Sequence, residues 1–141
     1  MASQSSEVEE TGFTYEIRDD GIVVYHLTDL RRDSVDQFID VSHNFDVQAF
    51  EEGRHSRCML DISKLKFPTP YAAKRIQQNS EATPDGLLES YAVVTPTSAI
   101  YTFARTILNH LPNAQAQSIR LFHDEASAIE WLQARLEQLG P

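Results

Sequence analysis

Two apolar runs near the start of the chain predict a β-hairpin. The runs FTYEIR and IVVYHL, at residues 13–18 and 22–27, are rich in the β-branched and aromatic residues that favour strands. The dipeptide Asp20-Gly21 lies between them, and it is a strong hairpin signal because glycine tolerates the positive φ of a tight turn. We therefore expect the two runs to pair as antiparallel strands.

A helical period follows the hairpin. The apolar positions after Ser34 recur with helical spacing, at Val35, Phe38, Ile39, Val41, Phe45 and Ala49. Ser34 and Gln37 fit a capping box, in which each side chain binds a free N–H group of the first turn. Gly53 suits the position just after a helix. We expect a helix of about four turns that begins at Ser34 and ends at Gly53.

Strands and helices then alternate to the end of the sequence. Short, mostly apolar runs predict strands at residues 57–63, 90–95 and 118–123. Apolar stripes with helical spacing predict helices over residues 69–80, 96–111 and 124–140. Asp124 is the expected N-cap of the last of these helices.

This order of elements predicts the fold class. The succession β-β-α-β-α-β-α-β-α implies parallel strand pairing with right-handed crossovers and helices that cover the sheet. The opening hairpin adds an antiparallel edge. We expect an α/β fold, a single domain over residues 13–141 with a mixed sheet of about five strands. Residues 1–12 are rich in Ser and Glu and predict a disordered tail, with an interaction tail as the alternative.

Charge and composition exclude several classes of function. The 141 residues carry a net charge of -9, which argues against nucleic-acid binding because neutralising phosphates requires a surplus of Lys and Arg. Cys58 is the single cysteine, so no internal disulfide can form. The sequence has no apolar run that would span a bilayer and no secretory signal at its start. We expect a cytoplasmic protein without an integral membrane segment.

Two stretches of the sequence resemble a known family. The strand YAVVTP leads into the helix AIYTFARTIL, and the ending IRLFHDEASAIEWLQ is similar to an F-x-D-E-x-x-A-x-x-W-L close. Both resemble the STAS-like superfamily (sulphate transporter and anti-sigma-factor antagonist domains), in particular its SpoIIAA-like branch, which is also similar to the fold of lipid-exchange proteins. The resemblance extends over roughly residues 13–139. It implies a compact domain without a cofactor that works by binding.

The resemblance does not carry over the regulatory switch of the anti-sigma-factor antagonists. In those proteins the loop after the central strand carries the motif D-S-S-G, and a kinase phosphorylates a serine there. The corresponding stretch in this chain is FPTPYA. When the two are aligned on Phe67, Thr69 falls on the Asp, Pro70 on the phosphorylated serine and Ala72 on the glycine. Because proline cannot be phosphorylated, we expect no such switch here.

Two strand ends are candidates for a binding edge. Thr69-Pro70 and Thr95-Pro96 each follow a predicted strand and precede a predicted helix. Thr accepts hydrogen bonds from the free N–H groups of a helix start, and Pro suits the first helical position. Both turns should lie at the carboxyl edge of the parallel strands, where ligands of open α/β sheets bind.

A basic band adds a docking surface to that edge. Residues 54–75 contain one acidic residue, Asp61, and six basic residues: Arg54, Arg57, Lys64, Lys66, Lys74 and Arg75. Helix N-termini also favour anions. The candidate residues for an edge that faces a protein partner or a small anion are Lys64, Lys66, Thr69, Tyr71, Lys74, Thr95, Thr97 and Tyr101. The alternative is two capped helices with a solvated cluster of charges.

Motifs of catalysis and metal binding are absent from the sequence. It contains no G-x-S-x-G, no P-loop and no G-x-G-x-x-G. None of its 5 histidines pairs with another at helical or zinc-like spacing. Cys58 lies in a predicted central strand and is expected to be a small core residue. We assign no catalytic, cofactor-binding or metal-binding residue, and we expect no cofactor.

Two binding functions fit these observations. The first hypothesis is a non-enzymatic regulatory domain that docks a protein partner or a second copy of the chain. The alternative is a carrier of a small lipophilic or amphipathic ligand, which requires a cavity lined by the third and fourth strands and the helices that follow them. Tyr71 and Tyr101 are candidates to line that cavity, and core packing is the other interpretation of both. An enzyme is the third hypothesis.

Overall fold

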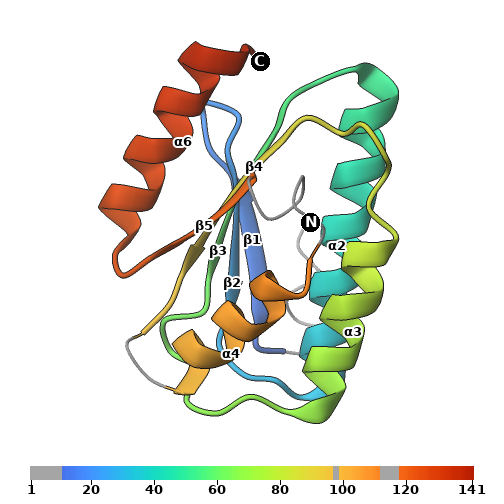
Figure 1. The fold of residues 1–141 in the computed structure, drawn as a ribbon, viewed down its shortest axis with the longest axis vertical. Helices are drawn as coiled ribbons and strands as arrows, with labels where there is room; N and C mark the ends of the chain where they lie inside the picture. The colour runs from blue at the N-terminus through green and yellow to red at the C-terminus, as the bar shows by residue number, and fades with distance from the viewer. Residues whose placement is uncertain (1–10, 97–98, 112–117) are drawn as a thin grey trace.

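The computed structural model describes residues 11–96, 99–111 and 118–141 (Figure 1). In chain order the elements are β1 (Phe13–Ile17), β2 (Val23–Leu27), α2 (Arg32–Glu52), β3 (Ser56–Asp61), α3 (Pro70–Glu81), β4 (Glu89–Val94), α4 (Ala99–Asn109), β5 (Ile119–Phe122) and α6 (Glu125–Leu139). Within the described ranges, no helix combines the length and the apolarity needed to cross a bilayer.

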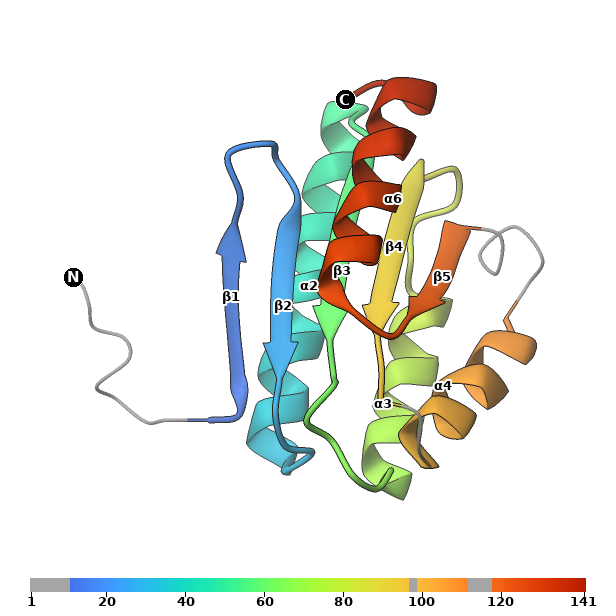
Figure 2. The same ribbon diagram turned by 90° about the vertical axis from the view of Figure 1, so that its left-hand side faces the viewer.

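The strands form one mixed sheet. Its order is β1-β2-β3-β4-β5, so each strand lies beside the strand that follows it in the sequence (Figure 2). β1 pairs with β2 in the antiparallel sense, and the other three pairs of neighbours are parallel. The predicted α/β class, the order of elements and the N-terminal hairpin are therefore confirmed.

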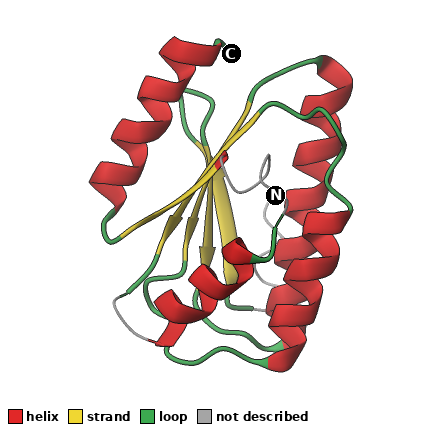
Figure 3. Ribbon diagram, viewed as in Figure 1, coloured by secondary structure: helices red, strands yellow, loops and turns green. Residues whose placement is uncertain are grey.

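The helices are distributed unequally over the two faces of the sheet. Each parallel crossover moves one strand in the same direction, so right-handed connections bring α2, α3 and α4 to the same face. α6 follows the last strand and packs on the opposite face (Figures 1 and 3). The molecule thus has three layers, with the sheet between one helix and a group of three.

Each face of the sheet has its own core because side chains alternate along the strands. Tyr25 and Cys58 point to the side of α2, α3 and α4, in a large cluster that includes aromatic residues of β1 and α2. Val24 and Met59 point to the side of α6, where Ala128 and other apolar side chains cover them. The buried position of Cys58 agrees with its interpretation as a core residue.

α4 packs differently from the other helices. It has the most regular apolar stripe of the predicted helices, yet Ile100 is its one fully buried residue among those described. Phe103 and Ile107, on the same stripe, are only half-buried. The helix therefore contributes apolar side chains to this face without closing the space between itself and the sheet.

The helix ends follow local rules. α2 ends at Gly53, whose φ of 67° lies in the left-handed region that glycine tolerates, as the sequence predicts. α3 begins after Thr69, and the N–H of Ala72 donates to its Oγ1 at 3.1 Å. The N–H of Ser127 donates to Oδ1 of Asp124 at 2.7 Å, which confirms the predicted cap of α6.

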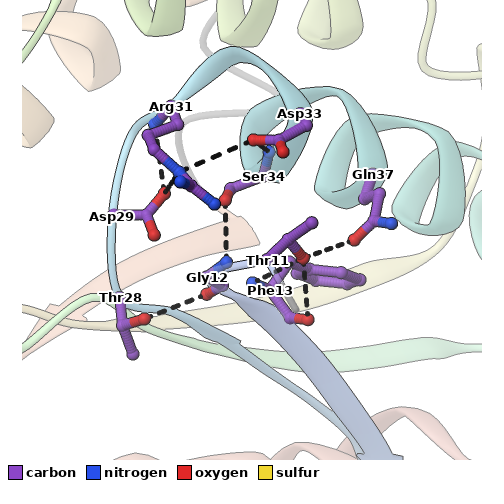
Figure 4. A network of polar contacts seen from close by, with 9 residues as sticks. All are labelled: Thr11, Gly12, Phe13, Thr28, Asp29, Arg31, Asp33, Ser34 and Gln37. Carbon is purple, nitrogen blue, oxygen red and sulfur yellow. Dashed lines mark hydrogen bonds and ion pairs between the residues drawn. The ribbon is translucent and has the colours of Figure 1, made fainter. Parts of the chain in front are cut away.

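The start of α2 corrects the predicted capping box. The helix begins at Arg32, so Ser34 lies inside the first turn, where its Oγ accepts the N–H of Gly12 at 2.8 Å. Gln37 accepts the hydroxyl of Thr11 at 2.6 Å instead of bonding the helix start (Figure 4). Both polar side chains are thus used to join α2 to the segment that enters β1. This use cannot be read from spacing within the helix.

The structure describes only the last two residues of the predicted tail. Residues 1–10 lie outside the described residues. Thr11 and Gly12 lie inside the described range. The carbonyl of Gly12 accepts the N–H of Thr28 at 2.8 Å and its hydroxyl at 3.2 Å (Figure 4). These hydrogen bonds hold residues 11 and 12 beside the first strand pair.

Candidate functional site

The turn between β3 and α3 carries exposed residues of the predicted binding edge. Lys64 and Lys66 are exposed in this turn, and Lys74 is exposed on α3. Phe67 lies beside Lys66 with 74% of its surface exposed, the highest fraction among the exposed large apolar side chains. Thr69 serves as the cap of α3, as predicted. An aromatic side chain thus lies in solvent next to cationic groups.

Tyr71 joins two helices and does not line the cavity described below. Its hydroxyl donates to Oδ1 of Asp36 on α2, and the guanidinium of Arg32 lies 4.6 Å from the centre of its ring. Arg75 donates to the same Asp36 oxygen at 3.1 Å. The hydrogen bond from Tyr71, with that from Arg75, lowers the pKa of Asp36. These contacts fasten α3 to α2.

The other predicted edge residues do not share one surface. Thr95 is fully buried just after β4, and its N–H donates to the carbonyl of Phe122 at 2.8 Å. The ring of Tyr101 lies 5.4 Å from that of His123, and Tyr101 does not line the cavity described below. Thr97 lies outside the described residues.

The basic band of the sequence is also divided. Arg57 is 9% exposed, and its guanidinium donates to the carbonyl of Asp20 at 2.8 Å, on the opposite face of the sheet from α3. Arg75 is paired with Asp36, as described above, and Arg54 with Glu52. The exposed cations of this segment that face solvent at the strand end are the three lysines.

A cluster of titratable groups lies on the α6 side of the same edge. Nδ1 of His26, at the end of β2, is 3.4 Å from Oδ2 of Asp61, which ends β3. Glu125, in the first turn of α6, completes a set whose ligand atoms all lie within 4.8 Å of one another. Nε2 of His26 lies 4.0 Å from the carboxylate of Glu16. No local pattern in the sequence indicates these four residues, because they come from four separate elements.

The carboxyl groups of Asp61 and Glu125 form a hydrogen bond with each other. The hydrogen bond to Asp61, together with burial, raises the pKa of Glu125. Burial opposes ionisation of Asp61, but hydrogen bonds from Glu125 and Ser63 outweigh it and lower its pKa. Imidazole and carboxylate groups are ligands of Zn²⁺ and Mn²⁺. The same contacts form a complete network without a metal ion, and we assign no metal to the cluster.

A cavity of about 130 Å³ lies between the sheet and the helices α2, α3 and α4. Leu60 of β3 and Ile62, just after that strand, line its wall, and β4 contributes Tyr91 and Val93. The remaining apolar lining comes from the helices and β5: Phe38, Ile39, Ile76, Phe103, Ala104, Ile107, Leu108, Leu111, Ile119 and Leu121. The cavity that a ligand carrier requires, lined by the third and fourth strands and the following helices, is therefore present.

Two carboxyl groups lie in the wall of this cavity. Asp46, on α2, is 5% exposed, and the hydroxyl of Ser56 bonds its carboxyl group. Glu89 begins β4 and lies opposite Ser56 in the sheet register. Asn79, Ser80 and Thr83 also contribute polar atoms to the lining. The polar part of the lining thus includes a pair of acids from two elements that the fold brings together.

Burial changes the titration of both acids. Burial raises the pKa of Asp46 to about 6. Burial, together with the nearby charge of Asp46, raises the pKa of Glu89 to about 8. None of the described side chains that line the cavity is Lys, Arg or His. The pair therefore has no cationic partner in the wall, and ionisation is costly for both groups.

The cavity adjoins a groove of about 820 Å³ at the amino end of β4. Glu89 lines both spaces, as do Ser80, Thr83 and Leu111. His110 and Arg135 line the groove. Glu89 thus lies where the cavity opens into the groove.

Comparison with known proteins does not place the chain in a family. No protein-family model matches it, and no curated protein sequence matches it. The resemblance to STAS-like domains stays a prediction, although the fold class that it implied is present. The evidence for the function of the site is therefore the arrangement of its own side chains.

Proposed function

We propose that this protein binds a small amphipathic molecule in the cavity between the sheet and helices α2, α3 and α4. The observation that carries the proposal is an apolar cavity of about 130 Å³ with two carboxyl groups in its wall. For comparison, an engineered apolar cavity of about 150 Å³ in another protein binds benzene. The function is binding without catalysis.

The energetics of the cavity favour a ligand. Apolar atoms that line an unfilled cavity lack dispersion contacts on one side, and this raises the free energy of the fold. A ligand that fills the space recovers part of that free energy through dispersion contacts. Half-buried α4 gives such a ligand a wall that can adjust around it.

Titration with toluene, a neutral apolar probe of suitable size, tests this function. Toluene should shift the methyl NMR signals of residues that line the cavity, such as Ile76 and Ile107. The signals of Ile22 and Val24 on the α6 side should not move. Ala104→Leu fills the cavity and should abolish the shifts. Uniform small shifts on both faces, or shifts that persist in this variant, would contradict the proposal.

A second function is favoured by the exposed side chain of Phe67. An aromatic ring with 74% exposure beside Lys64 and Lys66 suits docking of a partner with acidic and apolar surface. A STAS-like regulatory domain that binds a protein partner would use such a turn. This proposal concerns a surface that is separate from the cavity.

Substitution of Phe67 tests the docking function. A partner identified by affinity purification of the full chain should be lost from Phe67→Ala, with at least about tenfold weaker binding in titration of that purified partner. The matched control is Leu88→Ala, because Leu88 is also exposed, at 44%, just before β4. Equal retention of the partner by both variants would exclude docking through this turn.

A further inference from the structure

We propose that the ligand of the cavity carries a positively charged group, such as a protonated amine, which Asp46 and Glu89 bind together. This inference rests on the proposed binding function and specifies the chemical class of the ligand. Its apolar part would have about six or seven carbon atoms, since the cavity is slightly smaller than one that holds benzene.

Charge complementarity is the first argument. Neither carboxyl group forms an ion pair within the described residues, and the described lining of the cavity contains no cation. A buried carboxylate is unfavourable unless a cation or several hydrogen-bond donors compensate it. The hydroxyl groups that the two acids do bond, those of Ser56 and Ser118, are neutral. A cationic ligand would supply the missing charge.

The arrangement of the wall is the second argument. The acids come from different elements, α2 and β4, and both line the same cavity. Three aromatic side chains, those of Phe38, Tyr91 and Phe103, are also part of the lining. Carboxylates combined with aromatic rings are the groups that bind ammonium ions in proteins. The apolar remainder of the wall would hold the hydrocarbon part.

The same geometry disfavours anionic ligands. A carboxylate or phosphate in this cavity would face two acids without a basic side chain among the described lining residues. His110 and Arg135 are confined to the adjoining groove. The net charge of -9 also raises the local concentration of cations around the molecule and lowers that of anions. Fatty acids and other small anions are therefore disfavoured as ligands.

Three probes of matched shape test the inference: benzylamine, benzyl alcohol and benzoate. They share one ring and differ in whether the polar group is positive, neutral or negative. In calorimetric titration of the full chain at neutral pH, benzylamine should bind at least about tenfold more tightly than benzyl alcohol. Benzoate should bind more weakly than either.

Variants of the two acids identify the source of the preference. Asp46→Asn and Glu89→Gln each keep the size and hydrogen-bonding capacity of the side chain. Each should reduce the preference for benzylamine over benzyl alcohol to about threefold or less. Two variants are used because either one alone could disturb folding. Glu81→Gln is the control, since Glu81 lines the groove and not the cavity.

The outcomes separate the inference from the function on which it rests. If benzyl alcohol binds in the cavity as tightly as benzylamine, the inference is wrong and the binding function stands. The same conclusion follows if both acid variants keep the preference of the wild-type chain. If toluene and all three probes fail to bind, the binding function itself is refuted.

Discussion

Glu89 and Asp46 make the free energy of unfolding of this chain depend on pH. Both have pKa values in the folded chain, about 8 and about 6, that lie above those of the free side chains. The folded state therefore binds more protons than the unfolded state between about pH 4 and pH 8. The free energy of unfolding must fall as the pH rises through this window. These groups have no effect on the free energy of unfolding at acidic pH, where they are protonated in both states, and they destabilise the fold at alkaline pH.

The sign of this effect predicts the behaviour of Glu89→Gln. At pH 8 the variant should be more stable than the wild-type chain by on the order of 2 kcal/mol, because it has no carboxylate to bury. At about pH 3, below the ordinary pKa of glutamate, the wild-type group is protonated in both states and the difference should vanish. Urea denaturation followed by the fluorescence of Trp131, the single tryptophan, measures both values.

Two buried neighbours of Glu89 do not titrate in this window. Burial raises the pKa values of Tyr91 and Cys58, so both stay neutral across the window. Glu81→Gln, with its side chain exposed, should leave the pH dependence unchanged. A difference between Glu89→Gln and the wild type that is independent of pH would show that Glu89 ionises normally in the folded chain.

At the scale of elements, α4 determines whether the cavity exists. Its apolar stripe favours a fully packed helix, but the helix stands off from the sheet, and Ala104 faces the resulting space. Local sequence explains the formation of α4, since its apolar side chains have helical spacing. It does not explain how closely the helix approaches the sheet, because that distance depends on the side chains of the strands below.

Ala104→Leu should therefore stabilise the chain even though it blocks the binding of toluene. Added methyl groups would occupy empty volume, and cavity filling commonly raises the free energy of unfolding by about 1 kcal/mol. Thr102→Leu is the control, because it adds apolar volume at an exposed position on the same helix. The midpoint of urea denaturation compares the two. A destabilised Ala104→Leu would mean that the cavity does not accept a larger side chain.

The whole molecule is asymmetric across its sheet. On the α6 side, Ala128 and Leu132 are completely buried, and their helix contacts β3, β4 and β5. On the other side three helices share one face, and the last of them leaves the cavity and the groove beside β4. Binding of a small molecule is therefore expected on the side of α2, α3 and α4, while α6 gives the sheet a rigid support.

Features that depend on neighbours in the chain could be predicted from the sequence. The cap at Thr69, the glycine at the end of α2 and the cap at Asp124 involve residues within about one helical turn of each other. The predicted capping box at Ser34 is wrong because the partner of Ser34 is not a neighbour in the chain. Its side chain bonds Gly12, which the fold brings to the helix from a distant part of the chain.

The candidate site could be predicted only in part. Polar Ser42 and Asp46 lie on the apolar side of the predicted helix at helical spacing, and this pattern is the signal that could have pointed to Asp46. Glu89 precedes an apolar strand and shares the inward alternation of Tyr91 and Val93. Neither pattern reveals that the two acids line the same cavity. Nor does either show that Thr95 is buried or that Arg57 lies on the opposite face of the sheet from α3.

The sequence by itself determined the elements, their order and hence the mixed sheet. Periodic burial and short-range hydrogen bonds encode these features locally, and the handedness of parallel crossovers then leaves few topologies. Only the tertiary structure decided that Asp46 and Glu89 share a cavity without a cation and that the basic band is split between two faces. Such features depend on the packing distance between elements and on the environment of each charge, which no local pattern specifies.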